Sequence, residues 1–341
     1  MALLNQSCIL HYGEKGDISR FVLKDNAVFH TYWIRGEGVK KNDILAKGID
    51  DIKACSDGER LYLFCADMLG DIEIYSYKNE IMQRSVIKTG SEDLIMRDIR
   101  PYISGNRCEL LVSHSKRDDR NERILSKYSI NAGMLSEGCR YPDHRSRDLM
   151  EYETFGPVDE IVAVRYEEEC STIVSVIEKS EDSNSIILLK DNRFGFVEGL
   201  IKISMNSDIF WHDISVAGNE AEVVYTVRDG EGFSIKNIVY DIKKHSLSEE
   251  TLIREKNACS HPLLISYMGE KRICWYENGA VYSRRKNAEG EYENAVKHKE
   301  SIGRELFCAH FILDDKQLKK QAGADFRKVF LIYPDNTMTG F

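Results

Sequence analysis

The sequence has no apolar run that approaches the roughly 20 residues required by a membrane helix. The segment from Met1 to Ser7 contains neither a basic stretch nor a long apolar stretch, so no secretory signal is visible. We therefore expect no membrane span and a cytoplasmic location.

No two cysteines stand in a Cys-x-x-Cys pair, although the chain contains nine cysteines. Their odd number and scattered positions argue against both a disulfide framework and a structural zinc site. Most lie inside apolar runs, where a free cysteine packs as a small hydrophobic residue. We expect reduced cysteines in the core, no bound metal and no cofactor; the cysteines stand at 8, 55, 65, 108, 139, 170, 259, 274 and 308.

Excess positive charge is also lacking, because 56 acidic residues outnumber 47 Lys and Arg and the formal net charge at pH 7 is −9. A chain of this charge repels a phosphate backbone unless it carries a local basic patch. The best candidate, between His114 and Arg123, is interrupted by acids throughout. It is typical of a solvated hairpin loop, so we expect no nucleic-acid partner.

Helical periodicity of 3.6 residues is almost absent, which excludes long helical repeats. What the sequence has instead is hairpins, such as the two runs of β-forming residues around Asn278-Gly279, the strongest short-range hairpin signal. Seven such hairpins follow one another at a spacing of about fifty residues. The central residues of their first strands are Leu10, Leu63, Leu111, Val174, Val224, Ile273 and Leu331.

Most hairpins have one further apolar strand ahead of them and one behind, as with Ile81 to Ile87 and Leu200 to Ser204. A repeated unit of four antiparallel strands resembles the β-propeller superfold, which leaves few sheet edges open. The resemblance covers essentially the whole chain, 1–341, as a single domain of seven blades. Six blades plus an extension, or two β-sandwich domains, are the alternatives. The sequence contains no repeat motif of a particular propeller family, such as those of the WD, kelch, sialidase or fucose-lectin propellers.

The two ends of the repeat are incomplete in the sequence. The first unit has three recognisable strands, Ser7 to Tyr12, Ile18 to Lys24 and Val28 to Ile34, and the last hairpin stops at Phe341. We interpret the chain as the N-terminal part of a longer protein or as a ring that closes with two three-stranded blades.

Acidic residues and histidines recur just ahead of or at the start of the apolar strand that precedes most of the hairpins. In a propeller these strands line the central channel, so the resemblance implies a ring of such side chains at one channel mouth. Converging carboxylates can hold a cation, bind a cationic partner or act as an acid and base pair. A structural role in turns is the alternative for each residue. The ring comprises Asp51, Asp98, Glu160, Asp213 and His310, with Asp50, Asp159, His212 and His261 beside them.

The run Phe210-Trp211-His212-Asp213 combines an aromatic platform with two titratable groups. Adjacent residues of a strand point to opposite faces, so His212 and Asp213 cannot orient one another as in a nucleophilic triad. We interpret Trp211 as part of a stacking surface.

A long link between 137 and 156 holds a second group of candidate binding residues. Loops of this length are usually functional or disordered, and Arg and Tyr are enriched in interface hot spots. A partner-binding loop and a simple insertion are the two interpretations. The candidates are Tyr141, His144, Arg145 and Arg147.

The sequence favours a non-catalytic propeller that binds a protein partner at the acidic channel mouth and the 137–156 loop, by analogy with what propellers commonly do. One alternative is a glycan hydrolase or lyase with two carboxyl groups roughly 5 to 9.5 Å apart. Another is a carbohydrate-binding propeller, for which the 17 tyrosines could supply platforms although only three tryptophans are present.

Overall fold

The structure is a computed structural model in which the chain is almost entirely β-strand. Its contacts divide the chain into two compact units. The N-terminal unit comprises Gln6–Thr154 with Ala309–Gln321, and the C-terminal unit contains Phe155–Cys308 with Ala322–Phe341. Some strand residues are described by their backbone alone. The structure describes all residues except 1–5, 15, 35, 68, 79–80, 89–93, 105–106, 119–121, 132–144, 154–161, 167–168, 170, 180–183, 192–196, 257, 268–269, 299–305, 315–325, 333–337 and 341.

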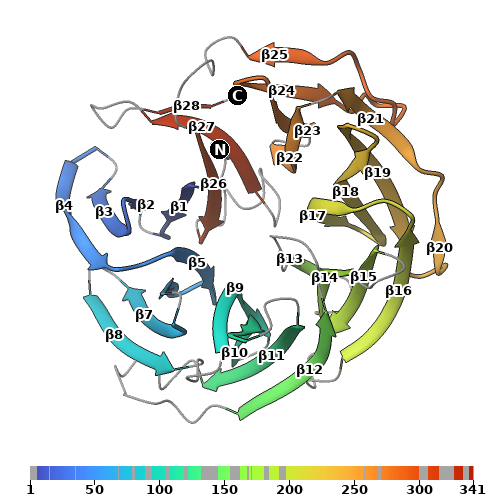
Figure 1. Cartoon of the computed structure of the whole chain (residues 1–341). Helices are drawn as coiled ribbons and strands as arrows, with labels where there is room; N and C mark the ends of the chain where they lie inside the picture. The colour runs from blue at the N-terminus through green and yellow to red at the C-terminus, as the bar shows by residue number, and fades with distance from the viewer. Residues whose placement is uncertain are drawn as a thin grey trace. The chain divides into compact units, whose positions relative to one another are not determined.

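The N-terminal unit contains three sheets of consecutive antiparallel strands, which Figure 1 shows in blue to green. Successive strands are separate because polar turns interrupt the apolar runs. The sheets are β1 (Gln6–Tyr12), β2 (Asp17–Lys24), β3 (Ala27–Ile34) and β4 (Gly38–Lys47); β5 (Asp51–Ser56), β6 (Leu61–Ala66), β7 (Asp71–Lys78) and β8 (Ile81–Lys88); and β9 (Leu94–Ser104), β10 (Arg107–Lys116), β11 (Glu122–Asn131) and β12 (Arg145–Glu153).

A strand from far along the chain, β26 (Leu306–Leu313), lies beside β1 in the first sheet. The residue that follows it, Asp314, donates its backbone N–H to the Tyr12 carbonyl at 2.9 Å. Its carboxylate is 2.7 Å from His11 Nε2 and accepts the Ser56 hydroxyl at 2.8 Å. Asp314 therefore ties the late strand to two strands near the beginning of the chain.

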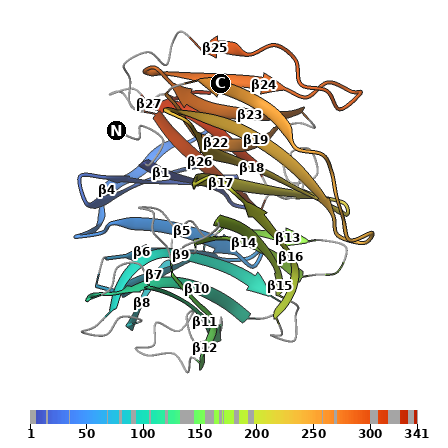
Figure 2. The same ribbon diagram turned by 45° about the vertical axis from the view of Figure 1, so that its right-hand side comes forward.

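The C-terminal unit repeats the four-stranded arrangement (Figure 2). In its middle sheet the outermost strand is split into two segments, both paired with β19. The strands are β13 (Val162–Tyr166), β14 (Ser171–Lys179), β15 (Asn184–Asp191) and β16 (Val197–Met205); β17 (Ile209–Ala217), β18 (Glu220–Asp229), β19 (Gly232–Asp241), β20 (Ser246–Leu247) and β21 (Thr251–Lys256); β22 (Cys259–Tyr267), β23 (Glu270–Glu277), β24 (Ala280–Arg285) and β25 (Val296–His298); and the hairpin β27 (Phe326–Ile332) with β28 (Met338–Gly340).

All seven predicted hairpins are confirmed as antiparallel pairs, from β1–β2 to β27–β28. The β23–β24 turn has φ of 49° at Asn278 and 78° at Gly279. Two successive positive φ values are what the favoured two-residue hairpin turn requires, which explains why Asn-Gly stands there. The turn chemistry thus sets the register of this hairpin, with Glu277 opposite Ala280.

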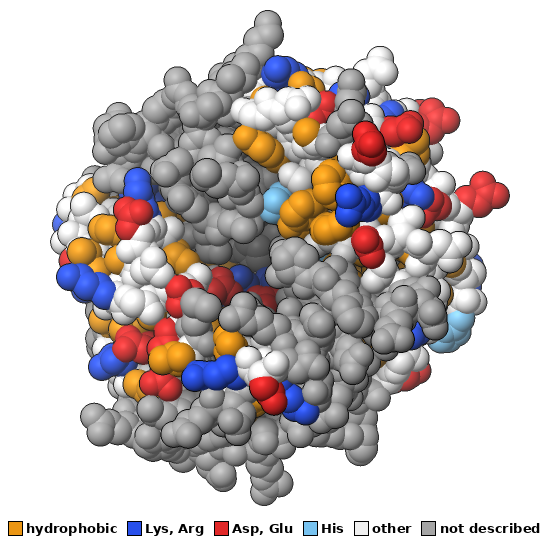
Figure 3. All heavy atoms as spheres, viewed as in Figure 1, with side chains coloured by type: hydrophobic (Ala, Val, Ile, Leu, Met, Phe, Trp, Pro, Cys, Tyr) orange, Lys and Arg blue, Asp and Glu red, His pale blue; other side chains and the backbone are white. Residues whose placement is uncertain are grey.

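The hydrophobic core lies between consecutive sheets. One cluster joins buried residues of the sheets that begin with β13 and β17, and another joins those that begin with β17 and β22. The N-terminal unit has equivalent clusters on both sides of the β5–β8 sheet. The middle sheet of each unit therefore buries apolar side chains on both faces, which accounts for near-continuous apolar strands such as β6. On the face that Figure 3 shows, charged side chains lie among the hydrophobic ones at the surface.

Two expectations were wrong. The first unit has a fourth strand, β4, and part of the link at 137–156 is the strand β12, paired with β11. Both outer strands are rich in polar residues, and eight of the ten residues of β4 are exposed. Neither carries the apolar pattern by which a strand is recognised in a sequence.

Among the described residues, no helix has the length and apolar character needed to cross a membrane.

Candidate functional site

The candidate site lies along β17 of the C-terminal unit, where this strand packs against β22 of the next sheet. Alternate residues of a strand share one face. Trp211, Asp213 and Ser215 share such a face. Trp211 belongs to an aromatic cluster, Asp213 accepts a backbone amide, and Ser215 lines a small pocket. The three features are therefore spaced along one strand.

The aromatic cluster consists of Phe210, Trp211, Phe233 and His261. The Trp211 ring lies 4.3 Å from the His261 ring, and the Phe210 and Phe233 rings meet edge to face at 5.2 Å. All four side chains are half-buried. The cluster thus offers aromatic surface that is held in place and still reaches solvent.

His261 is held in an uncommon conformation within this cluster. Its φ is 51°, the left-handed region that non-glycine residues rarely adopt, and the register of β22 shifts between Ser260 and Leu263. Its Nδ1 lies 2.9 Å from the Ser260 hydroxyl oxygen. Burial lowers the pKa of His261 to about 4, so the imidazole beside Trp211 is neutral at pH 7.

Asp213 is buried between the two sheets, where its Oδ2 accepts the backbone N–H of Leu264 at 2.8 Å. A carboxylate that accepts a backbone N–H from the next sheet links the two sheets directly. The neighbouring His212 is also buried. Of Trp211, His212 and Asp213, only Trp211 therefore belongs to the half-buried surface.

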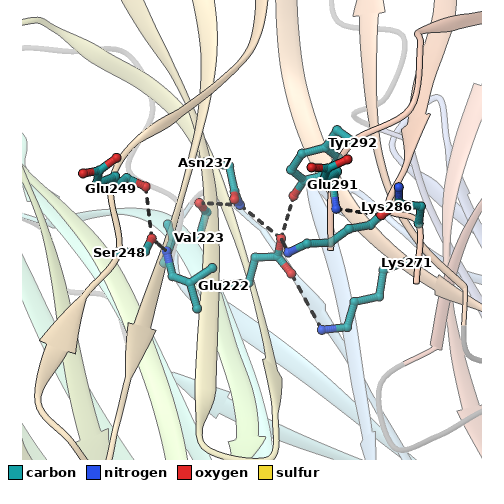
Figure 4. Close-up of polar contacts among 11 residues, drawn as sticks. Glu222, Val223, Asn237, Ser248, Glu249, Lys271, Lys286, Glu291 and Tyr292 are labelled. Atoms are coloured by element: carbon teal, nitrogen blue, oxygen red, sulfur yellow. Dashed lines mark hydrogen bonds and ion pairs between the residues drawn. The ribbon is translucent and has the colours of Figure 1, made fainter. Parts of the chain in front are cut away.

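A second carboxylate, Glu222, lies opposite Ser215 in the β17–β18 pair. Figure 4 shows side chains from other segments converging on it. Its Oε1 accepts the Tyr292 hydroxyl at 2.7 Å, the Lys286 ammonium at 3.3 Å and the Asn237 amide at 3.3 Å. The Lys271 ammonium lies 3.8 Å from its other oxygen. Glu222 is therefore surrounded by side-chain donors.

A pocket that opens to solvent adjoins this carboxylate, with an empty volume of about 260 Å³ that includes the solvent at its mouth. Its polar lining comes from Ser215, Glu222, Tyr292 and three basic residues, and its apolar lining from Leu264, Ile265 and Ile273. Burial and the adjacent Glu222 raise the pKa of Tyr292, so its phenol stays protonated and donates to the carboxylate. The basic residues are Lys271, Arg272 and Lys286.

The Glu222 network was not predicted from the sequence. Glu222 precedes an apolar run in β18, and its hydrogen-bond partners lie between 15 and 70 residues away along the chain. The network joins β18 and β19 of one sheet to residues of the next sheet and of the segment after β24, a combination that no local sequence pattern signals. Residue types alone do not mark Glu222 apart from other strand acids.

Two of the predicted ring residues, Asp51 and Asp98, approach the same ammonium in the N-terminal unit. Lys53 Nζ is 2.7 Å from Asp51 Oδ1 and 4.0 Å from Asp98 Oδ1. The nearby Asp50 accepts the Asn26 amide at 2.7 Å. Two carboxylates thus lie within 4.0 Å of one ammonium. Among the described residues, no group of three or more His, Cys, Asp or Glu could hold a metal ion.

The remaining predicted residues are placed by their backbone or lie outside the described part of the chain. Arg145 and Arg147 lie in β12, and His310 lies in β26. Four others lie outside the described residues: Tyr141, His144, Asp159 and Glu160.

The chain matches no family model and no curated protein. Solved structures are similar in fold. A six-bladed β-propeller lectin of Aleuria aurantia with a fucose recognition mode has 9% sequence identity to this chain and a TM-score of 0.50. The match covers 87% of this chain and 96% of the lectin chain. An oligogalacturonate lyase in complex with manganese has 10% sequence identity to this chain and a TM-score of 0.54. The match covers 86% of this chain and 77% of the lyase chain.

A quinonprotein alcohol dehydrogenase-like protein of Bacteroides thetaiotaomicron is also similar, with 12% identity, coverage of 86% of this chain and 66% of its own, and a TM-score of 0.52. Identities this low carry the fold alone. The chain has a β-propeller fold of four-stranded antiparallel blades, as the resemblance in its sequence implied.

Proposed function

We propose that this chain is a non-catalytic β-propeller module that binds a carbohydrate on the aromatic cluster of Phe210, Trp211, Phe233 and His261. The observation that carries the proposal is the half-buried Trp211 ring, which is held by its aromatic neighbours. Pyranose rings expose flat C–H faces that pack on aromatic rings. Such a platform binds best when it is rigid before the ligand arrives.

The polar groups around the platform also suit a neutral, hydroxyl-rich ligand. His261 is uncharged at pH 7 because burial lowers its pKa, and a neutral imidazole can both donate and accept hydrogen bonds. The Ser260 hydroxyl lies beside it. The positive φ of His261 has a conformational cost, and strained residues of this kind concentrate at functional sites.

The shared fold does not choose the ligand. One neighbour is a fucose-recognising lectin, whereas another is an oligogalacturonate lyase. Seven blades formed by the seven hairpins are part of our proposal, although the lectin has six. Catalysis is not part of it, and the buried Asp213 does not belong to the half-buried surface of the platform.

The test is calorimetric titration of the purified chain with a panel of monosaccharides and oligosaccharides. We expect saturable binding by at least one sugar, and a loss of about tenfold or more in affinity in Trp211→Ala. The matched control is Trp33→Ala, because Trp33 is also half-buried but lies in β3 of the N-terminal unit. Absence of binding to every sugar, or equal affinity in Trp211→Ala, would contradict the proposal.

A protein partner is the second candidate, at the acids near Lys53 and the 137–156 segment. The observation that favours it is the pairing of Asp51 and Asp98 with a single lysine, Lys53. Electrostatic recognition of a basic partner would weaken with salt and with Asp51→Lys. A cytoplasmic location is part of this second proposal.

Affinity capture with the wild type and Asp51→Lys tests this second candidate, with Glu37→Lys as the control because Glu37 is exposed on another part of the same unit. We expect a basic protein to be captured by the wild type and by the control, and to be lost with Asp51→Lys. Capture that neither salt nor Asp51→Lys reduces would contradict this candidate.

A further inference from the structure

The pocket beside Glu222 carries more positive than negative charge. Arg272 is paired with Glu270 at 2.9 Å, which leaves Lys271 and Lys286 against the single carboxylate of Glu222. Two ammonium groups and one carboxylate have a surplus of one positive charge. We propose that this pocket binds the carboxylate group of a small monocarboxylic acid.

The placement of Lys271 distinguishes a binding site from a purely structural ion network. Its ammonium is 3.8 Å from Glu222, beyond hydrogen-bond distance, and its side chain is 37% exposed. An ammonium has three donors, so Lys271 can bind an incoming carboxylate without first losing a short hydrogen bond to Glu222. Lys286, in contrast, already donates to Glu222 at 3.3 Å.

The other lining groups set the kind of anion. A monocarboxylate carries one negative charge, which balances the one surplus positive charge of the pocket. A phosphate dianion carries two negative charges, and the second would be repelled by Glu222. The Ser215 hydroxyl can hydrogen-bond a polar group of the ligand, and Leu264, Ile265 and Ile273 supply apolar surface for its carbon skeleton. The pocket is open to solvent at its mouth, so the proposed ligand presents its carboxylate to the lysines there and its carbon skeleton lies in the opening.

Glu222 acts in this site as an internal competitor for the two lysines. Removing its charge should therefore strengthen ligand binding. If Glu222 were instead needed to hold the lysines in place for a ligand, the same change would weaken binding. The two interpretations thus predict opposite signs for Glu222→Gln, and the sign of this change in affinity is the most discriminating readout.

The experiment is calorimetric titration of the full chain with glucuronate and with acetate. Glucose serves as the neutral counterpart of glucuronate, and inorganic phosphate as the dianionic probe. We expect one carboxylate per chain, no competition by glucose and weaker binding of phosphate. Lys271→Gln should lower the affinity about tenfold, Lys271→Arg should restore most of it, and Glu222→Gln should raise it.

The controls separate this site from the aromatic cluster and from misfolding. Lys47→Gln removes an exposed lysine of β4 and should leave the affinity unchanged. Acetate has no sugar ring to pack on the aromatic cluster, so acetate binding that Lys271→Gln weakens identifies this site, and failure of the carbohydrate proposal does not affect this one. Thermal unfolding of each variant verifies folding. Absence of binding by both carboxylates, an affinity that Lys271→Gln leaves unchanged, or weaker binding in a folded Glu222→Gln overturns the proposal.

Discussion

Asp213 and Glu222 are buried carboxylates of the same sheet, and they differ in what satisfies them. Asp213 accepts the backbone amide of Leu264, which the fold holds in place. Glu222 accepts a short hydrogen bond from the Tyr292 hydroxyl and otherwise meets lysines and an amide at 3.3 Å or more. A backbone donor cannot leave without disturbing the sheet, whereas a lysine side chain can turn to another anion.

This difference indicates how to separate structural from functional acids in a propeller. Both residues are almost fully buried, so burial does not distinguish them. The kind of donor and the presence of an adjoining pocket do. By this criterion Asp213 joins two sheets, and Glu222 lies at a site that can exchange partners.

The largest expected effect is on stability. Asp213→Ala leaves the buried Leu264 N–H without its carboxylate acceptor, so we expect a loss of about 3 kcal/mol in the free energy of unfolding. Glu222→Ala should cost less, because Lys271 and Lys286 can reach water. Urea denaturation measures both values. Asp213→Asn, which retains a carbonyl acceptor, is the matched control and should lose less than Asp213→Ala.

The reverse order, with Glu222→Ala the more destabilising change, would contradict the distinction between the two acids. It would mean that the Glu222 network is as structural as the Asp213 contact, and that the lysines cannot exchange partners without unfolding the sheet.

The hairpins and the repeat could be predicted from the sequence, because turn residues and apolar alternation are local. Asn278-Gly279 is an example, since both residues have the positive φ that their turn requires. The polar outer strand β4 was missed because its residues are mostly exposed and carry no apolar period. Trp211 was recognised as a stacking residue, but its partners Phe233 and His261 come from other strands. Such long-range pairs depend on packing between strands and sheets, which residue types do not encode locally.

A second prediction concerns pH and the aromatic end of the same strand. Burial lowers the pKa of His261 to about 4, below its usual value near 6.5. Between these values the unfolded chain binds a proton that the folded chain does not, so stability falls as pH falls from 7 to 4. We expect His261 to contribute a loss of up to about 2 kcal/mol between pH 7 and pH 5.

The measurement is the free energy of unfolding at both pH values for the wild type and His261→Asn. Asparagine tolerates a positive φ and does not titrate, so it removes the proton and keeps the backbone conformation. The variant should lose less stability than the wild type on acidification. Burial also lowers the pKa of His30 to about 4, but His30 remains in both proteins and its contribution cancels in the difference. Equal losses in the two proteins would show that His261 is protonated in the folded state at pH 5.

A third prediction separates the partners of Glu222. The hydrogen bond from Tyr292 at 2.7 Å should give a coupling energy of about 1 kcal/mol or more in a double-mutant cycle with Glu222→Gln and Tyr292→Phe. The cycle with Lys271→Gln should give less than about 0.5 kcal/mol, because the ammonium is distant and partly exposed. Strong coupling to Lys271 would indicate that this lysine is committed to Glu222 and not available to a ligand.

The smallest expected effect lies in the N-terminal unit, where Lys53 is shared by Asp51 and Asp98. The contact to Asp51 is short, at 2.7 Å, but the pair is partly exposed. A double-mutant cycle with Asp51→Asn and Lys53→Gln should give about 0.5 kcal/mol at low salt and less in about 1 M salt, because salt screens exposed pairs. The Glu222–Tyr292 coupling should change little under the same conditions, since a buried hydrogen bond from a neutral phenol is screened less. If both couplings fell equally with salt, Glu222 would be as accessible to ions as the Asp51 group, and its contrast with that exposed pair would not hold.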